Sequence, residues 1–386
     1  MALFESPSTS PAERVRAASG RVASASGTWV LIGENVDHFG GVTLVGTSSL
    51  RAAAAVSPRT DGVISIAARG PLGQEFSAQL PYSDEPADGL ARRWWGLVHT
   101  LVQRQVLSRD TSGMDITVES DVPVGAGLGA LYAADAAIAL ALAGGHDDVD
   151  TAPFRARLAE ICSHAVDTYS SLPVLRARHS VALRGAAGVS VVDYADGSLT
   201  QAPHPSRHGV RVFSVSQELG APFTQSREAI AERRAFIDAA CSNFGVSSLR
   251  QLPDAPGRAV QWVEARRAAG DTNAPEPEAA RRWVAFCESE TLRSLAAAKA
   301  LRSRRANELF TLLNSPSEAH DLASPDALVA LTRKRGAVAA RPAAIGTSDA
   351  VIAFVPVQEA DSFAAAMARE FEVVEVAAGE PARLEG

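Results

Sequence analysis

Short hydrophobic runs separated by glycine turns fill the first third of the chain. Runs that are β-branched or that alternate polar and apolar positions predict strands at 28–32, 42–45, 63–67 and 114–119. Apolar residues at helical spacing predict helices at 90–106, 130–143 and 153–169. A further β-branched run predicts a strand at 188–194 before the second half begins.

The second half of the chain is mostly helical in pattern. It opens with a predicted strand at 210–216, and apolar spacing then predicts helices at 225–242, 257–268, 276–301 and 303–313. The Pro/Asn/Asp cluster at 270–277 predicts a turn. A strand at 351–355, a helix at 361–371 and a short strand close the chain. Strands and helices without strict βαβ alternation favour an α+β fold.

A glycine-rich loop, Ser120-Asp-Val-Pro-Val-Gly-Ala-Gly-Leu-Gly129, stands between a predicted strand and an alanine-rich helix. Such a loop is suited to an anion, because exposed N–H groups and the positive end of the helix dipole point at it. An enzyme that transfers phosphate usually adds a hydroxyl or two here to hold a metal ion. This chain continues with Ala130, Leu131 and Tyr132.

Composition narrows the class of protein without deciding its function. The chain has 386 residues and a net charge of −7, and this acidic balance argues against a nucleic-acid partner. Three cysteines lie far apart, without metal-ligand spacing or a disulfide framework, and are interpreted as buried thiols. Since neither a secretory signal nor an apolar membrane-spanning run is seen, we expect a cytoplasmic protein without a membrane partner.

Three segments together resemble the galactokinase branch of the GHMP small-molecule kinases. They are Leu31-Ile-Gly-Glu-Asn-Val-Asp-His-Phe-Gly-Gly41, the loop Pro123–Leu128, and Arg281–Glu290 with Leu301–Asn314. The resemblance implies an N-terminal α/β lobe at 1–205, a C-terminal α+β lobe at 206–386 and an active site in the cleft between them. It also implies transfer of the γ-phosphoryl group of ATP to O1 of galactose.

The first segment carries the sugar-binding positions of that family. Glu34 and Asp37 match carboxylates that accept hydrogen bonds from sugar hydroxyls, and Asn35 replaces a histidine. The alternative is that the two carboxylates only cap a turn. Thr28 stands where the family has a catalytic arginine; Arg21 lies in a similar Gly-Arg-Val, but aligning it needs seven extra residues.

The glycine loop matches the nucleotide-phosphate loop of the family. Its implied nucleotide-binding positions are Pro123, Gly125, Ala126, Gly127, Leu128, Gly129 and Ala130. The serine run that helps to hold Mg²⁺ reads Gly129, Ala130 and Leu131 here, with no side-chain oxygen. The backbone still allows a phosphate cradle for ATP, and the alternative is a loop kept for packing. We assign no metal ligand and do not expect these side chains to hold Mg²⁺.

Two further catalytic positions depart from the family. Its second metal-holding group, a glutamate, falls on Val166, and the neighbouring Asp167 points about 100° away on a helix. Its catalytic aspartate falls on Arg178. A tyrosine that lines the sugar site is replaced by Ile230, and Gly346 is the remaining glycine of a reduced C-terminal glycine-rich segment.

These departures fall on the base, both metal ligands, the arginine and the aromatic of one site. Loss of a positioned base typically costs about 10²–10⁴ in rate. We therefore predict weak or absent kinase activity and a nucleotide- or sugar-binding, regulatory role. The alternatives are an active sugar kinase with relocated groups such as Asp167 or Arg21, and a purely structural or partner-binding protein.

Arg178 suggests a specific hypothesis. A guanidinium pairs bidentately with phosphate oxygens, so a site without metal ligands but with this arginine fits metal-independent binding of a nucleotide or phosphosugar. The alternative is a solvated arginine on the surface. The sequence specifies neither a protein partner nor an oligomeric state.

Overall fold

The structure is a computed structural model that describes the chain except residues 1–3, 5–6, 19, 221–225 and 317–321. Among the described residues, eight strands form a sheet with the order β12-β1-β2-β5-β3-β4, which β6 and β7 extend from β2. The strands are β1 (Arg21–Ile32), β2 (Val42–Pro58), β3 (Val63–Arg69), β4 (Glu75–Pro81), β5 (Met114–Ser120), β6 (Val189–Asp193), β7 (Ser198–Ala202) and β12 (Arg383–Glu385).

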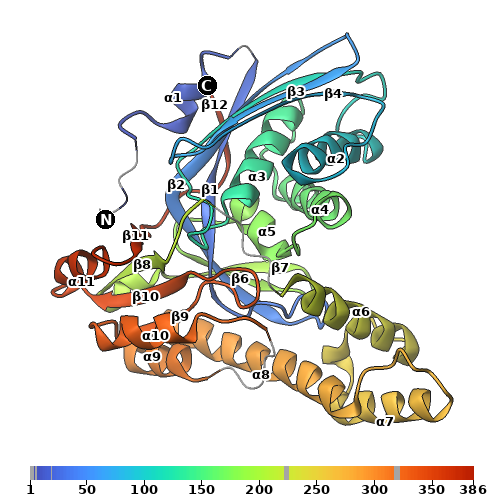
Figure 1. Ribbon diagram of the computed structural model, residues 1–386, viewed down its shortest axis with the longest axis vertical. Coiled ribbons are helices and arrows are strands. Elements are labelled where there is room, and N and C mark those ends of the chain that lie inside the picture. The colour runs from blue at the N-terminus through green and yellow to red at the C-terminus, as the bar shows by residue number, and fades with distance from the viewer. Residues whose placement is uncertain (1–3, 5–6, 19, 221–225, 317–321) are drawn as a thin grey trace.

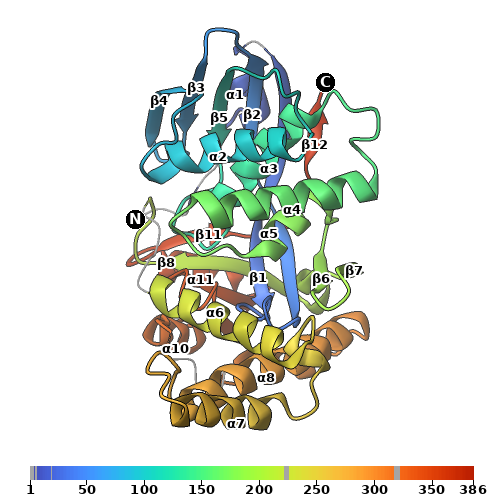
Figure 2. The ribbon, with the colours of Figure 1, turned by 90° about the vertical axis from the view of Figure 1, so that its right-hand side faces the viewer.

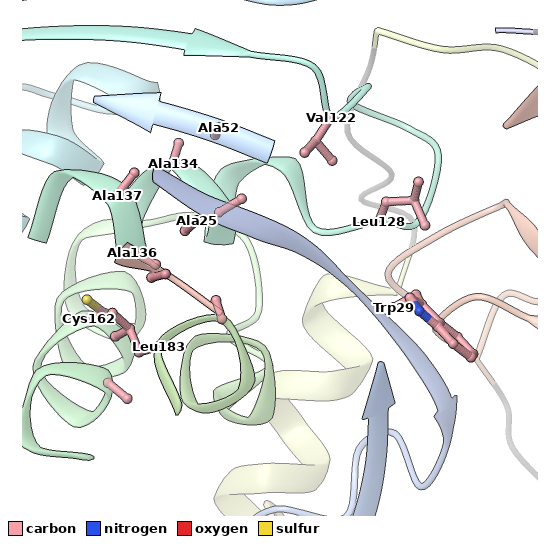
Figure 3. Close-up of a cluster of buried hydrophobic side chains, with 14 of the residues drawn as sticks. Ala25, Trp29, Ala52, Val122, Leu128, Ala134, Ala136, Ala137, Cys162 and Leu183 are labelled. Atoms are coloured by element: carbon pink, nitrogen blue, oxygen red, sulfur yellow. The ribbon is translucent and has the colours of Figure 1, made fainter. Parts of the chain in front are cut away.

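Helices α2, α3, α4 and α5 cover one face of this sheet (Figure 2). The helices of this part are α1 (Pro11–Val15), α2 (Gly89–Gln103), α3 (Ala130–Ala143), α4 (Ala152–Tyr169) and α5 (Arg176–Arg184). Figure 3 shows alanines of α3, among them Ala134, beside Ala25 of β1 and Ala52 of β2. Because both surfaces carry small side chains, α3 packs close to the sheet and is buried from Ala133 to Ala143.

The second part of the chain is built on a smaller antiparallel sheet with the order β11-β8-β10-β9. Its strands are β8 (Val210–Ser216), β9 (Ala339–Pro342), β10 (Val351–Pro356) and β11 (Glu372–Glu375). The helices here are α6 (Arg227–Phe244), α7 (Ala255–Ala268), α8 (Pro277–Arg302), α9 (Ala306–Asn314), α10 (Asp326–Lys334) and α11 (Ala360–Met367). Figure 1 shows α6 to α8 at the end of the molecule opposite β3 and β4.

The predicted α+β fold is confirmed. The predicted elements at 130–143 and 210–216 coincide with α3 and β8, and the predicted turn at 270–277 separates α7 from α8. Helix α5, which carries Arg178, was not predicted from its polar sequence Arg-Ala-Arg-His-Ser. It forms because its polar side chains find partners inside the protein, a tertiary effect that local periodicity does not report. All three cysteines are free thiols, but Cys241 is only partly buried, so the buried interpretation is wrong there.

An irregularity in β1 places the glycine loop against the sheet. The pairing of β1 with β2 shifts register between Ser26 and Thr28. There the N–H of Thr28 donates to the oxygen of Leu128 in the loop, at 2.8 Å. Figure 3 shows Val122 and Leu128 beside the strand that carries Trp29. The loop is therefore fixed to the middle of the longest pair of strands.

Candidate functional site

The glycine loop adopts the geometry that its sequence suggested. Gly125, Gly127 and Gly129 all have positive φ angles, of 91°, 67° and 66°. Gly129 is the N-cap of α3, and no side chain caps the helix. The leading N–H groups of α3 therefore lack intrahelical partners beside a cavity lined by Gly129, Ala130 and Leu131. This cavity encloses about 110 Å³.

Arg178 lies buried between the loop and β1. Its side chain is 3% exposed. One Nη donates to the oxygen of Thr28 and the other to the oxygen of Gly127, the second at 3.0 Å. Burial lowers the pKa of Arg178 to about 10. The alternative of a solvated surface arginine is therefore wrong.

Thr28, at the position where the resemblance expects an arginine, is fully buried. Its Oγ1 has no hydrogen-bond partner among the described residues. A Cβ added to Gly129 would lie 2.8 Å both from this Oγ1 and from Nη1 of Arg178. The glycine at 129 is thus required by its backbone angle and by the close approach of the arginine.

Tyr132 links the first turn of α3 to the segment that precedes α5. Its hydroxyl donates to the oxygen of Pro173 at 3.1 Å and accepts from the N–H of Leu175 at 2.9 Å. The guanidinium carbons of Arg93 and Arg178 lie 5.4 and 5.7 Å from its ring centroid. Aromatic rings attract cations at such distances. The sequence drew attention to Tyr132 only because it follows the loop where a small hydroxyl residue was expected. Its bridging role was missed.

A buried polar network lies behind Tyr132. Asp135 pairs with Arg93 at 2.5 Å and with His179 at 3.1 Å, and His179 Nδ1 lies 3.0 Å from the hydroxyl of Ser163. Burial by itself would raise the pKa of Asp135, but the charge of Arg93 and the hydrogen bonds from His179 and Arg93 lower it to about 2. Since Asp135 already neutralises Arg93, this network contributes structure to the site rather than a free charge.

Glu34 is buried, and its carboxylate faces an arginine of the second lobe. Oε1 lies 3.5 Å from Nη2 of Arg341 in β9. The same Nη2 lies 2.9 Å from Glu290 in α8, and Glu290 also accepts from the N–H of Gly33 at 3.3 Å. Glu290 ends the Arg281–Glu290 segment that carries part of the resemblance, but neither it nor Arg341 was named as a site residue from the sequence. The carboxylate of Glu34 is thus held by a buried charge cluster that joins the two parts of the chain.

Asn35 and Asp37 complete the turn after β1. Asn35 has a positive φ of 59° and donates from Nδ2 to the oxygen of Ile345 at 3.0 Å. Oδ2 of Asp37 lies 3.4 Å from Nη2 of Arg234. Glu34 and Asp37 therefore face arginines, and neither is hydrogen-bonded to a backbone N–H of the turn among the described residues.

Two cavities meet at Arg178. The glycine-loop cavity lies on one side, and on the other is a cavity of about 10 Å³ lined by Glu34, Asn35, Asp37 and Tyr194. The smaller volume suits about one water molecule. Ile230 lines a third cavity, of about 20 Å³, which also contacts Asn35. The structure thus brings the predicted residues together around one arginine, with more room on the loop side.

The positions named for relocated catalytic groups do not reach this site. Asp167 is exposed on α4, next to the buried Val166. Arg21 begins β1 and donates to the oxygen of Ala141 near the C-terminal end of α3, at 3.4 Å. Since the glycine loop precedes the N-terminal end of α3, Arg21 lies at the wrong end of that helix. Among the described residues that line the loop cavity, the carboxylate is that of Asp349, which is accompanied by Thr347 and Ser348.

The side chains at the positions where the resemblance expects metal ligands do not fit Mg²⁺. Gly129, Ala130, Leu131 and Val166 offer no side-chain oxygen, and Mg²⁺ prefers carboxylates together with substrate phosphates. Within the described part of the chain, no cluster of three or more His, Cys, Asp or Glu residues is placed to hold a metal ion.

Comparison with known proteins finds similarity both in sequence and in fold. No family model matches the chain. A galactokinase of Streptomyces coelicolor is 28% identical over 297 residues, which cover 74% of this chain and 72% of the relative. The crystal structure of Lactococcus lactis galactokinase complexed with galactose superimposes with a TM-score of 0.75 at 16% identity, covering 96% of this chain and 98% of that one. The chain is a galactokinase homologue with the GHMP kinase fold.

The wider fold family matches less closely than the Lactococcus lactis galactokinase. Mevalonate kinase of Methanococcus jannaschii superimposes with a TM-score of 0.54 at 12% identity, over 96% of this chain and 99% of that one. The galactokinase homologue therefore has the two-lobed fold that the resemblance implied, and residues of both parts line its glycine-loop cavity. None of its helices, among the described residues, is long and apolar enough to cross a membrane.

Proposed function

We propose that this galactokinase homologue is a cytoplasmic nucleotide-binding protein with weak or no kinase activity, which acts as a regulatory module. One observation carries the proposal: the buried guanidinium of Arg178 stands between the glycine loop and the Glu34–Asp37 turn. Phosphoryl transfer by such a fold needs a carboxylate near the attacking hydroxyl and a metal that neutralises the phosphates. Where the resemblance expects the carboxylate, this chain has the positively charged Arg178, and the residues at the expected metal-ligand positions have no side-chain oxygen.

The rate consequences of these losses are large. A missing base costs about 10²–10⁴ in rate, and a missing metal ion removes several kcal/mol of charge stabilisation. Arg178 does not accept a proton from a sugar hydroxyl, because its guanidinium remains charged at neutral pH. The site therefore retains surfaces for binding while it lacks the groups for transfer.

The two sides of the site differ in the ligand that they favour. The loop side offers glycine backbone, the open N–H groups of α3 and a cavity of about 110 Å³. On the sugar side, Glu34 and Asp37 already face Arg341 and Arg234, and the cavity is about 10 Å³. We therefore expect ATP to bind more readily than galactose, with sugar binding requiring these ion pairs to open.

The proposal is tested by measuring binding and turnover on the same preparation. Calorimetry with ATP, and a coupled kinase assay over galactose and related sugars, are run beside the Streptomyces coelicolor galactokinase as the active control. The expected result is ATP binding without turnover above the background without protein. Turnover comparable with the control enzyme, or the absence of any nucleotide binding, would contradict the proposal.

Asp349 supports a second candidate function, an active sugar kinase with a relocated carboxylate. It lines the loop cavity beside the hydroxyls of Thr347 and Ser348, and burial raises its pKa. An acid of this kind is suited to proton transfer or to metal binding. If the assay detects turnover, Asp349→Asn should abolish it, whereas the exposed Asp167→Asn should leave it unchanged.

A further inference from the structure

Arg178 is a buried cation that forms no ion pair with an acidic side chain of the described residues. No described residue forms an ion pair with it, although its side chain is 3% exposed. Burying an unpaired charge is costly, so buried arginines are normally neutralised. Arg93 and Arg341 follow this rule, since they pair with Asp135 at 2.5 Å and with Glu290 at 2.9 Å.

Arg51 provides a comparison inside the same protein. Burial lowers its pKa to about 10, as it does for Arg178. Yet Arg51 uses all its donors, because Nε and both Nη atoms bond to Ser24, Ser26 and the carbonyl oxygens of Glu380 and Pro381. A guanidinium has five N–H donors, and the two hydrogen bonds of Arg178 leave three without a described partner.

Arg178 lines a cavity on either side, and the glycine-loop cavity is the larger of the two. At the glycine-loop cavity, the leading N–H groups of α3 have neither an intrahelical partner nor a side-chain cap among the described residues. Helix dipole, open backbone donors and a guanidinium without an ion-pair partner among the described residues therefore act on the same space. All three favour a group with negative charge and several acceptor oxygens, which is the chemistry of a phosphate.

We propose that Arg178 binds a phosphate group of a nucleoside polyphosphate directly, in place of a metal ion, at the glycine loop. The ligand's nucleoside part rests on the proposed function, whereas the anion site rests on Arg178 itself. The guanidinium supplies the positive charge that Mg²⁺ would otherwise bring. The phosphate in turn accepts hydrogen bonds from the donors of Arg178 that have no described partner. Binding therefore does not need Mg²⁺, and the metal competes with Arg178 for the same oxygens.

The test is calorimetry with ATP, ADP, adenosine and inorganic pyrophosphate, each with EDTA and with Mg²⁺. The wild-type protein should bind ATP in EDTA at least as tightly as with Mg²⁺. Arg178→Gln removes the charge but keeps a planar donor, and it should weaken ATP and pyrophosphate binding roughly 10- to 100-fold. Adenosine affinity should not change. Arg207→Gln, which removes the same charge at an exposed position, is the matched control.

Arg178→Lys keeps the charge with a single ammonium and should give intermediate affinity. If a thermal scan shows that Arg178→Gln does not fold, the proposal is tested by the ATP affinity of the lysine variant and by wild-type binding in EDTA and in Mg²⁺. Strict dependence of wild-type ATP binding on Mg²⁺, or equal ATP affinity in the wild type and the folded variants, overturns the proposal. If ATP does not bind but pyrophosphate does, and Arg178→Gln abolishes that binding, the nucleotide function fails while the anion site stands.

Discussion

The guanidinium of Arg178 donates a hydrogen bond to the backbone oxygen of Thr28, 150 residues earlier in the chain. These are the two positions at which the resemblance to galactokinases expects an aspartate and an arginine. Relative to that expectation, the cation comes from helix α5 instead of strand β1, and no acid stands at position 178. A charge exchange of this kind retains a buried cation at the site but removes the base.

The positions 28 and 178 should be energetically coupled. Thr28→Arg alone places a long side chain at a fully buried position next to Arg178, at a cost of about 1–3 kcal/mol. In the double variant Thr28→Arg with Arg178→Asp, the new arginine gains both space and an acidic partner. We expect a coupling free energy of about 1–3 kcal/mol from urea unfolding of the single and double variants. Additive effects would contradict the contact.

Adding Val166→Glu to that double variant tests the origin of the catalytic loss. If the scaffold is intact, the triple variant should phosphorylate galactose detectably in a coupled assay while the wild type does not. The expected gain is partial, because the serine run after the loop is still absent. A stable triple variant without any gain in activity would show that these three positions do not account for the missing kinase activity.

Gly129→Ala should damage both stability and anion binding. Its added Cβ would meet Nη1 of Arg178 and Oγ1 of Thr28 at 2.8 Å. Gly62 is the matched control, since it has a positive φ of 78° and no atom within 4 Å of an added Cβ. Gly62→Ala should cost about 1 kcal/mol for its backbone angle, and Gly129→Ala about 1–3 kcal/mol more. Equal losses in chemical unfolding would show that the arginine does not fill this space.

Glu290 should be essential to the charge cluster around Glu34. It is 1% exposed and lies 2.9 Å from Arg341 and 2.7 Å from Arg293. Glu290→Gln keeps the shape but leaves buried guanidinium charge, so unfolding free energy should fall by about 3–5 kcal/mol. Glu288→Gln, at an exposed position on the same helix, should change it little. Similar values for the two variants in urea unfolding would refute the role of this cluster.

His204 should make the protein sensitive to acid. Burial lowers its pKa from 6.5 to about 4, so between these values the unfolded chain binds a proton that the folded chain does not. The contribution of His204 to the free energy of unfolding is therefore complete above pH 6.5 and is lost as the pH falls toward 4. Its slope is up to about 1.4 kcal/mol per pH unit. His204→Asn should reduce the slope by that amount in urea unfolding between pH 4 and 7. An unchanged slope would rule out His204 as its source.

Much of the fold was predictable because its signals are local. The alanine-rich pattern located α3, and alternation located β5 and β8. Helix α5 escaped prediction, because its polar residues are buried by partners that are distant in sequence: Arg178 by Thr28 and the glycine loop, His179 by Asp135. Periodicity reports which face of an element is apolar, and it carries no signal when polar groups are satisfied inside the core.

The candidate site divides in the same way. The sequence alone determined which side chains are present: a glycine loop without a following serine, no acid at 178 and no arginine at 28. Only the tertiary structure decided the environment of Arg178, because its hydrogen-bond partners lie on β1 and in a loop about 50 residues before it. Arg178 is buried from solvent, two carbonyl oxygens accept hydrogen bonds from it, and no carboxylate of the described residues lies within ion-pair distance. The cost of a buried charge depends on that environment, and no residue pattern records it.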